Sequence, residues 1–283
     1  MALSVTNLCK EYNDFKLDNV SFNLPKGYIM GLVGKNGAGK STTIKSILNI
    51  TDFSGKILID GKDNRIDEIA VKQSEGVVVD NPFFPVSFTL KQIDKYVGCF
   101  YDSWNSDTYY KLLKKFGLSK DKKVSELSRG MGVKLQLAVA LSHNAKLLVL
   151  DEPTSGLDPV ARDELMDILM EYIEDSENSI LFSTHISSDL ERIADYITII
   201  SNGKIFYTGE KDVLLSKYFI IKGDYRKIPD SLKNKLVGVR KYNDGFEAII
   251  DKADCGEIDK SHFCLENAKI DDILIYTERD NRL

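Results

Sequence analysis

Residues 34–41 combine glycines, a lysine and a serine at a spacing that can bind a chain of phosphates. They read Gly-Lys-Asn-Gly-Ala-Gly-Lys-Ser, which fits the phosphate-loop pattern of Gly, four free positions, Gly, Lys and Ser or Thr. Glycines let the backbone curl until successive N–H groups point at one centre, and the start of the following helix adds partial positive charge. Lys40 can then reach the outer phosphates, and the Ser41 hydroxyl can ligate Mg²⁺. The sequence therefore predicts a site for a nucleoside triphosphate.

The segments around this loop have the patterns needed to position it. Residues 28–33 form an apolar run typical of a strand, and residues 42–48 place apolar side chains at helical spacing. Two further apolar runs, 146–150 and 180–184, fit strands buried on both faces of a parallel sheet. Polar residues follow them directly: Asp151 and Glu152 after the first, His185 after the second. Because the site of a mostly parallel sheet lies at the carboxyl ends of its strands, these side chains are expected near the phosphate loop.

Changes of pattern along the chain predict its organisation. Residues 1–30 alternate as antiparallel strands do, whereas a region of about 82–142 keeps helical spacing and contains a helix for which Ser128 is the expected N-cap. Strands that alternate with helices indicate an α/β fold with a mostly parallel sheet in residues 1–215. Residues 216–283 are predicted to form a small α+β accessory domain. Its expected short strands are 218–221, 246–250 and 273–276.

The composition limits the classes of function. A formal net charge of −5 and a pI near 5.4 argue against broad nucleic-acid binding. The four scattered cysteines, with no Cys-x-x-Cys spacing, are most simply buried apolar residues in a reducing compartment. No run approaches the ~18 apolar residues of a membrane helix, and the N-terminus has no signal pattern. We therefore expect a soluble chain whose membrane role, if any, requires a partner.

The order of these motifs resembles the ATP-binding subunit of ABC transporters, over roughly residues 1–215. The distinguishing part is the segment Leu127-Ser128-Arg129-Gly130, which opens a helix between the phosphate loop and the strand that ends on Asp-Glu. The resemblance implies the P-loop NTPase fold of an ABC cassette, with a parallel core, an antiparallel β subdomain and a helical subdomain. It also implies that two cassettes stack head to tail around ATP.

The resemblance assigns roles to residues of the ATP site. Asp151 would hold Mg²⁺ through water, together with Ser41, and Glu152 would act as the general base on the attacking water. His185 would contact the γ-phosphate as the switch histidine. The nucleotide would be held by the loop residues Asn36, Gly37, Ala38, Gly39, Lys40, Ser41 and Thr42.

Other roles lie outside the loop. Tyr12, expected on a loop between the first two strands, would stack on the adenine. Ser128 and Gly130 would face the γ-phosphate of the opposite cassette, and residues 155–158 match the D-loop that crosses to it.

Two positions depart from the family pattern. Asp80 stands where a glutamine is usual, and as a carboxylate it can still ligate Mg²⁺. Arg129 replaces the first glycine of the usual Leu-Ser-Gly-Gly-Gln; it could attract phosphate or face solvent. Both departures resemble bacterial cassettes of ABC-2-type exporters, including those similar to bacitracin-resistance transporters. The tail around residues 269–274 is also similar to that group.

These features predict an ATP-hydrolysing subunit that powers a membrane exporter through ATP-driven dimerisation. The partners implied are integral-membrane permease subunits and a second cassette, in a homodimer or a paired heterodimer, at the cytoplasmic face of the cell membrane. The permease is expected to dock between the Asp80 loop and the helical region before Ser128. Phe83, Phe84 and Phe88 are candidate docking residues, and packing inside the helical subdomain is the alternative.

Two other functions remain open on the sequence. One is a soluble ABC-family ATPase that acts on ribosomes or DNA, although such proteins usually carry two cassettes or a long coiled-coil insert. The other is a phosphate-loop kinase or GTPase, which would not explain residues 127–130 and, for a GTPase, would need a guanine-reading Asn-Lys-x-Asp segment.

Overall fold

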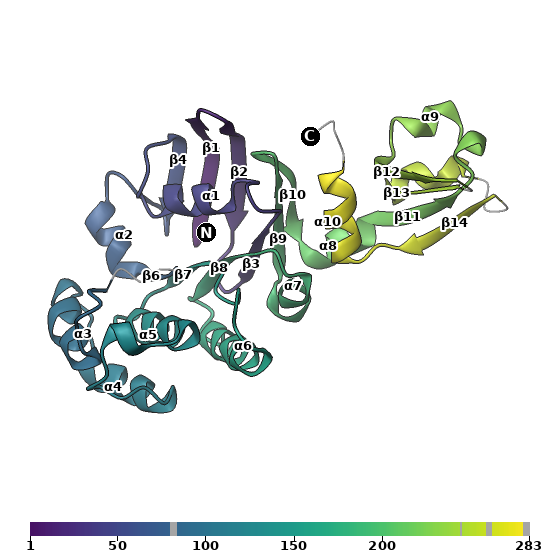
Figure 1. The fold of residues 1–283 in the computed structure, drawn as a ribbon. Helices are drawn as coiled ribbons and strands as arrows, with labels where there is room; N and C mark the ends of the chain where they lie inside the picture. The colour runs from purple at the N-terminus through teal and green to yellow at the C-terminus, as the bar shows by residue number, and fades with distance from the viewer. Residues whose placement is uncertain (80–83, 244, 259–261, 280–283) are drawn as a thin grey trace.

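The central element is a six-stranded sheet with the order β10-β9-β3-β8-β7-β6. The computed structural model describes residues 1–283 except 80–83, 244, 259–261 and 280–283 (Figure 1). Within the sheet, β10 is antiparallel to β9 and the other neighbours are parallel. The strands are β3 (Ile29–Val33), β6 (Glu75–Val78), β7 (Leu147–Asp151), β8 (Ser179–Thr184), β9 (Tyr196–Ser201) and β10 (Lys204–Glu210).

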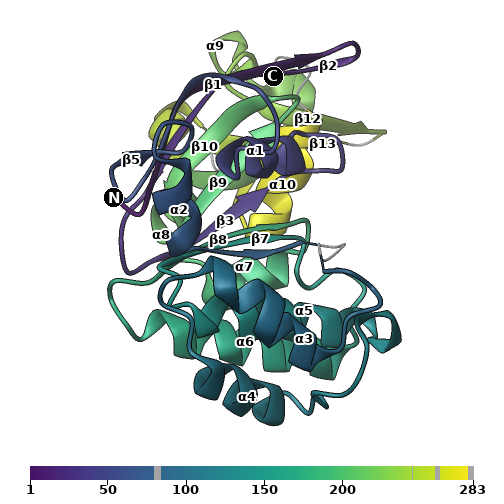
Figure 2. The same cartoon turned by 90° about the vertical axis from the view of Figure 1, so that its left-hand side faces the viewer.

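Two layers cover the central sheet, because its inner strands are apolar on both faces. In β7, Leu148 and Leu150 pack with α5 (Arg129–Ser142), α6 (Pro159–Ile173) and α7 (Ser187–Ile193). Leu147 and Val149 pack on the other face with α1 (Lys40–Ile47) and the antiparallel sheet. Figures 1 and 2 show α1 on one side of the central sheet and α5 and α6 on the opposite side.

The antiparallel sheet has the order β2-β1-β4-β5. Its strands are β1 (Leu3–Tyr12), β2 (Phe15–Leu24), β4 (Ser54–Ile59) and β5 (Lys62–Asp63). The short helix α2 (Glu68–Ser74) connects it to β6. This sheet and α1 share one hydrophobic cluster, which places the phosphate loop between the two sheets.

Three capped helices form the helical region. Thr89 caps α3 (Leu90–Val97), and its side chain accepts from the backbone N–H of Gln92. Asn105 caps α4 (Ser106–Lys115), and its side chain accepts from the backbone N–H of Thr108. Ser128 caps α5 by accepting a hydrogen bond from the backbone N–H of Met131, as predicted. Such caps satisfy the exposed N–H groups of the first helical turn. No helix in the described ranges is both long and apolar enough to cross a membrane.

The chain continues through α8 (Lys211–Lys217) into a separate antiparallel sheet of order β12-β13-β11-β14. This sheet has a hydrophobic cluster of its own, whereas helix α10 packs into the main one. The elements are β11 (Tyr218–Gly223), α9 (Asp230–Lys233), β12 (Val237–Tyr242), β13 (Gly245–Asp251), β14 (Phe263–Asn267) and α10 (Ile270–Glu278).

One prediction for this part of the chain is wrong, and so is the prediction that the cysteines are buried. Residues 273–276 lie in α10, not in a strand, because Ile270, Ile273 and Thr277 recur at helical spacing and are buried. The cysteines are not buried: Cys99 and Cys264 are exposed, and the other two are half-buried. Cys264 lies on the edge strand β14, where one face meets solvent.

Candidate active site

A cavity of about 680 Å³ opens beside residues 34–41, at the carboxyl ends of β3, β7 and β8. Figure 1 shows these three strand ends side by side, with α1 starting above them. The cavity is lined by Asp14, Phe15, Lys35, Asn36, Gly37, Gly39, Lys40, Ser41, Thr42, Arg129, Asp151, Glu152, Ser155 and His185. The fold therefore brings together the loop and the three polar residues that the sequence placed after apolar strands.

The backbone of the loop has a shape that glycine permits. Gly37 and Gly39 have φ angles of 84° and 117°, in the left-handed region. A Cβ atom at Gly39 would lie 2.6 Å from Leu17 Cδ2, so no larger residue fits there without a shift. Thr42 is in the first turn of α1, whereas Ala38 is buried behind the loop and packs in the hydrophobic cluster around α1.

Lys40 is buried at the base of the cavity, with 5% of its side chain exposed. Its Nζ donates to the carbonyl oxygens of Gly34 at 2.7 Å and Lys35 at 3.3 Å. It also lies 3.2 Å from Oε1 of Glu152. The ammonium group is therefore held at the loop by three oxygens, in a place where phosphate oxygens can compete for it.

Glu152 connects this lysine to His185. Its Oε2 lies 2.7 Å from His185 Nδ1, so one carboxylate contacts both side chains. The backbone of Glu152 has a φ of 50°, an uncommon value for a residue with a side chain. Lys40, Glu152 and His185 thus form one network of polar contacts beside the phosphate loop.

Asp151 and Ser41 offer oxygen atoms of the kind that Mg²⁺ prefers. Ser41 Oγ donates to Asp151 Oδ1 at 3.3 Å. Among the described residues, no cluster of three or more His, Cys, Asp or Glu side chains could hold a metal ion by itself. This small donor set fits Mg²⁺, which usually keeps several waters and takes one or two protein oxygens together with substrate phosphates.

Ser183, in β8, contacts the Asp151 carboxylate and the Glu152 backbone and was not predicted as a site residue. Its Oγ donates to Asp151 Oδ1 at 2.6 Å and accepts from the backbone N–H of Glu152 at 2.9 Å. A polar residue at a buried strand position, next to two predicted site strands, is the sequence signal that could have identified it. Its hydroxyl fixes the direction of the Asp151 carboxylate.

Ser183→Ala is therefore expected to weaken the apparent affinity for Mg²⁺ in ATP hydrolysis by about tenfold. This is the lower end of the range for loss of a group that hydrogen-bonds to a metal ligand. The check is a Mg²⁺ titration of hydrolysis at saturating ATP. Ser179→Ala is the matched control, because Ser179 is a buried serine at the other end of β8. An unchanged Mg²⁺ titration in Ser183→Ala would remove this role.

Ser128 and Gly130 lie outside the described lining of this cavity, at the start of α5. Arg129, between them, does line the cavity, and its guanidinium lies close to Gly156. Arg129 is exposed and also lines the cavity, so its position is compatible with both alternatives left by the sequence.

The predicted position of Tyr12 is wrong. It is the last residue of β1, not a loop residue, and it pairs with Phe15 of β2. Tyr12 is exposed and contacts Lys10, with 5.3 Å from Lys10 Nζ to the ring centre, outside the described lining of the cavity. Phe15 is the aromatic residue that lines the cavity, and the tight β1–β2 turn places it there.

Of the remaining predicted residues, the structure describes two. Asp80 and Phe83 fall outside the described residues. Phe84 and Phe88 are partly buried and pack against the main hydrophobic cluster. Phe84 also lines a second cavity, which is distinct from the one beside the phosphate loop.

Helix α10 reaches the phosphate loop through an ion pair. Glu278 Oε2 lies 2.9 Å from Lys35 Nζ, and the glutamate side chain is 19% exposed. Lys35 lines the cavity, so this pair draws a cation of the loop toward the end of α10.

Glu278→Gln is expected to tighten ATP binding by up to about fivefold, because an exposed pair of this kind is worth ~0–1 kcal/mol and its loss releases Lys35 toward the phosphates. Calorimetric titration with ATP measures the change. Glu266→Gln is the control, because it breaks the equally long pair between Glu266 of β14 and Lys222 of β11. Equal or weaker binding in Glu278→Gln would contradict this coupling.

Comparisons with known proteins agree with this geometry. The family described as ABC transporter matches residues 17–155. The lantibiotic transport ATP-binding protein SrtF of Streptococcus pyogenes is 35% identical over 218 residues, which cover 74% of this chain and 91% of that relative. The bacitracin transport ATP-binding protein BcrA of Bacillus licheniformis is 32% identical over 207 residues, which cover 72% of this chain and 68% of that relative.

A solved structure described as the ATP-binding subunit of an ABC transporter gives a TM-score of 0.69 at 28% identity, covering 76% of this chain and 92% of its own. Another, the ADP conformation of an ATP-binding cassette of an ABC transporter, gives a TM-score of 0.63 at 25% identity. It covers 75% of this chain and 92% of its own. The family match covers about half of this chain, and the two relatives and two solved structures each leave about a quarter of it unmatched.

Proposed function

Because this chain belongs to the ATP-binding subunits of ABC transporters, which hydrolyse ATP to drive transport, we propose that the cavity beside residues 34–41 is its ATP site and that the chain powers an exporter. The observation that carries the assignment is the network of Lys40, Glu152 and His185 at the phosphate loop. Lys40 binds the outer phosphates, Glu152 accepts a proton from the attacking water, and His185 orients Glu152 and contacts the γ-phosphate.

We propose that Asp151 and Ser41 hold Mg²⁺ on the phosphates. Their adjacent oxygens and the support of Asp151 by Ser183 favour this role. The bound ion would neutralise negative charge on the phosphates while the γ-phosphoryl group is transferred to water. Phe15, in place of Tyr12, is the aromatic candidate to contact the base, because it lines the cavity.

The working unit is proposed to be a head-to-tail dimer. Ser128 is exposed, and Ser128 and Gly130 lie outside the described lining of their own cavity, which suits contact with the ATP of a second cassette. Each charge-assisted hydrogen bond to a γ-phosphate contributes about 1.5–3 kcal/mol. A few such bonds at two sites are enough to shift an open–closed equilibrium of the dimer.

The membrane partner is proposed to be a permease subunit on whose cytoplasmic face the cassette docks. The names of the two relatives, lantibiotic and bacitracin transport proteins, support a role in the export of compounds of that kind. Phe84, beside the second cavity, is a candidate contact.

The test is purification of the tagged full chain from membranes in mild detergent, with measurement of ATP hydrolysis. The proposal expects a polytopic membrane protein in stoichiometric amount and hydrolysis that depends on Glu152. Stoichiometric ribosomes or DNA in place of a membrane protein would contradict the export role and support the soluble ATPase.

A further inference from the structure

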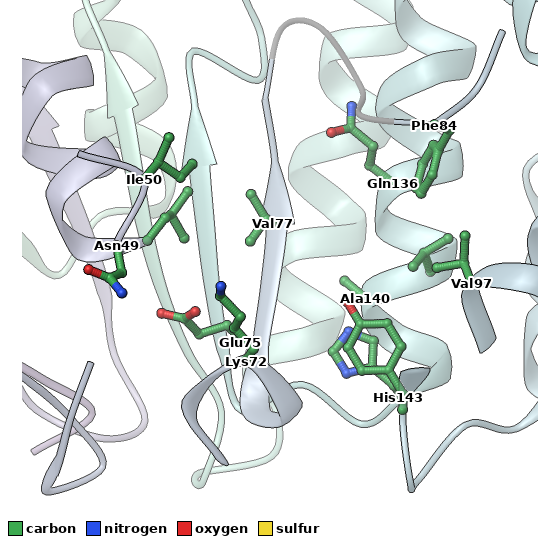
Figure 3. A pocket seen from close by; sticks show the side chains of 13 residues that line it. Asn49, Ile50, Lys72, Glu75, Val77, Phe84, Val97, Gln136, Ala140 and His143 are labelled. Carbon is green, nitrogen blue, oxygen red and sulfur yellow. The ribbon is translucent and has the colours of Figure 1, made fainter. Parts of the chain in front are cut away.

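Two cavities outside the ATP site differ in the character of their walls. The second cavity, of about 410 Å³, is mostly apolar, and Figure 3 shows Val77, Phe84 and the buried Glu75 in its wall. Another, of about 240 Å³, lies between α6 and α7 and is lined by Leu157, Pro159, Arg162, Asp163, Met166, Ser188, Asp189 and Arg192. This α6–α7 cavity carries charges of both signs. Its residues follow closely in the chain on Ser155 and His185, which line the ATP cavity.

Asp189 of α7 has a buried carboxylate, 2% exposed, in which both oxygens are paired. Oδ2 accepts from Thr154 Oγ1 at 2.7 Å and from Thr184 Oγ1 at 3.4 Å. Oδ1 accepts from Arg162 Nε at 2.7 Å, and Arg162 Nη2 lies 2.5 Å from it. Burying a charge is costly unless it is paired and hydrogen-bonded. The carboxylate therefore holds its three neighbours in fixed places, and we call these four residues the Asp189 cluster.

The cluster joins segments that end at the ATP site. Thr154 stands two residues after Glu152, in the chain that leaves β7. Thr184 is the last residue of β8 and directly precedes His185. The third partner of Asp189 is on α6. One buried carboxylate thus links the chain beyond Glu152 to the chain that carries His185.

The backbone at Glu152 needs such a support. Its φ of 50° is uncommon for a residue with a side chain, and such conformations persist only where the surrounding structure holds them. Before the turn, Glu152 N–H donates to Ser183 Oγ at 2.9 Å. Within it, Ser155 N–H donates to the Glu152 carbonyl oxygen at 3.2 Å, which closes a turn around Thr154. The hydrogen bond from Thr154 to Asp189 ties this turn to α7.

We propose that Asp189 is a positioning residue for ATP hydrolysis. Its carboxylate sets the turn after Glu152 against the end of β8, at the separation that brings Glu152 Oε2 to 2.7 Å from His185 Nδ1. Asp189 is outside the described lining of the ATP cavity, so it acts through Thr154 and Thr184. The inference rests on the proposed function of Glu152 and His185.

The same two helices carry a second set of ion pairs, which supplies a matched control. Arg192 of α7 pairs with Asp163 and Asp167 of α6, and these side chains are 41%, 63% and 69% exposed. They join α6 to α7 at the surface and do not involve Thr154 or Thr184. Asp163→Asn therefore removes a contact between the helices while the Asp189 cluster stays intact.

The first experiment measures the steady-state kinetics of ATP hydrolysis. Asp189→Asn and Thr154→Val should lower kcat by about 10- to 100-fold, the upper value being that for a catalytic group displaced by about 1 Å. The KM for ATP should change less than about twofold, because the loss is in the position of the reacting groups. Thr154→Ser keeps the hydroxyl and should keep the wild-type kcat, as should Asp163→Asn.

Thr154→Val matches the shape of threonine and leaves the Arg162 pair in place, so this test does not depend on the folding of Asp189→Asn. A wild-type kcat in Thr154→Val overturns the proposal. An equal loss of kcat in Thr154→Ser and Thr154→Val also overturns it, because the hydroxyl is then not the cause.

The second experiment detects the position of His185 without nucleotide. A carboxylate can only accept a hydrogen bond, so the contact with Glu152 places the hydrogen of a neutral His185 on Nδ1. The chain has three histidines, and the ¹⁵N signals of His185 are those lost in His185→Gln. The spectra are recorded at about pH 8.5, well above the ordinary histidine pKa of about 6.5.

The wild type, Thr154→Ser and Asp163→Asn should show the Nδ1–H tautomer of His185. Thr154→Val and Asp189→Asn should show a mixture of tautomers, because the carboxylate of Glu152 no longer lies at a fixed distance. A contact that only stabilised the fold would lower the melting temperature and leave the tautomer as it is. An unchanged tautomer in both variants overturns the proposal.

Failure of the proposed function is distinguishable from failure of this inference. If Glu152→Gln hydrolyses ATP as the wild type does, the proposed function of Glu152 fails, and the positioning role fails with it. A large loss in Glu152→Gln beside wild-type kinetics in Thr154→Val overturns the role of Asp189 alone.

Discussion

Glu152→Gln is expected to lower the rate of ATP hydrolysis by about 10²–10⁴-fold, the range for loss of a general base, while ATP still binds. Glutamine keeps the length of the side chain but cannot accept the proton of the attacking water. The carboxylate lies 3.2 Å from Lys40 Nζ and 2.7 Å from His185 Nδ1. When ATP draws Lys40 to its outer phosphates, Glu152 loses that partner and becomes available to water.

The same substitution should accumulate an ATP-bound dimer, because hydrolysis is the step that reopens it. Gel filtration of Glu152→Gln with Mg²⁺ and ATP is expected to show a dimer that the wild type does not hold. A monomer under these conditions would count against the sandwiched-ATP mechanism.

Glu164→Gln controls for the chemical change itself. Glu164 is an exposed carboxylate on α6 that pairs with Lys134, away from the phosphate loop. Its hydrolysis rate should match that of the wild type, and the specific activity of both should rise with protein concentration. Activity that does not depend on concentration would indicate a site complete within one chain.

The motif residues could be predicted because local patterns determine where they lie. The phosphate loop and the polar residues after β7 and β8 follow directly from short apolar runs that end at one edge of the sheet. The family resemblance and the fold class that these motifs predicted are confirmed by the comparisons.

The errors come from short segments whose pattern has two readings. Residues 273–276 are four apolar or aromatic residues, which fit a strand as well as a helix. The Asp272 side chain, which accepts from the backbone N–H of Lys269, favours the start of α10. Tyr12 and Phe15 are both aromatic and flank one turn. Their register in the β1–β2 pair places Phe15 at the cavity.

The second cavity could not be predicted from sequence. Glu75 precedes an apolar run, where an acidic residue normally faces solvent, and its burial depends on the packing of α5 and Tyr101 from distant parts of the chain. Ser183 differs in that its polar side chain at a buried strand position was a signal in the sequence, but its contacts with Asp151 and Glu152 depend on the pairing of β7 with β8. Non-local contacts of this kind leave no periodic signal.

Lys40→Ala is expected to weaken ATP binding by about 10- to 150-fold, since a hydrogen bond to a charged group contributes about 1.5–3 kcal/mol. Lys40 Nζ is the buried cation of the loop, held by two carbonyl oxygens and Glu152, and its position in the ATP site makes the outer phosphates its competing partners. Calorimetric titration with ATP measures the loss. Lys45→Ala, at an exposed lysine of the same helix, should bind as the wild type does.

A second variant separates the charge of Lys40 from its packing. Lys40→Met keeps an apolar stem of similar length in the buried position but has no ammonium group. If charge is the reason for the loss, Lys40→Met and Lys40→Ala should weaken ATP binding equally. If Lys40→Met binds ATP as the wild type does, the loss in Lys40→Ala comes from a collapsed loop, and the assignment of Lys40 to the phosphates is wrong.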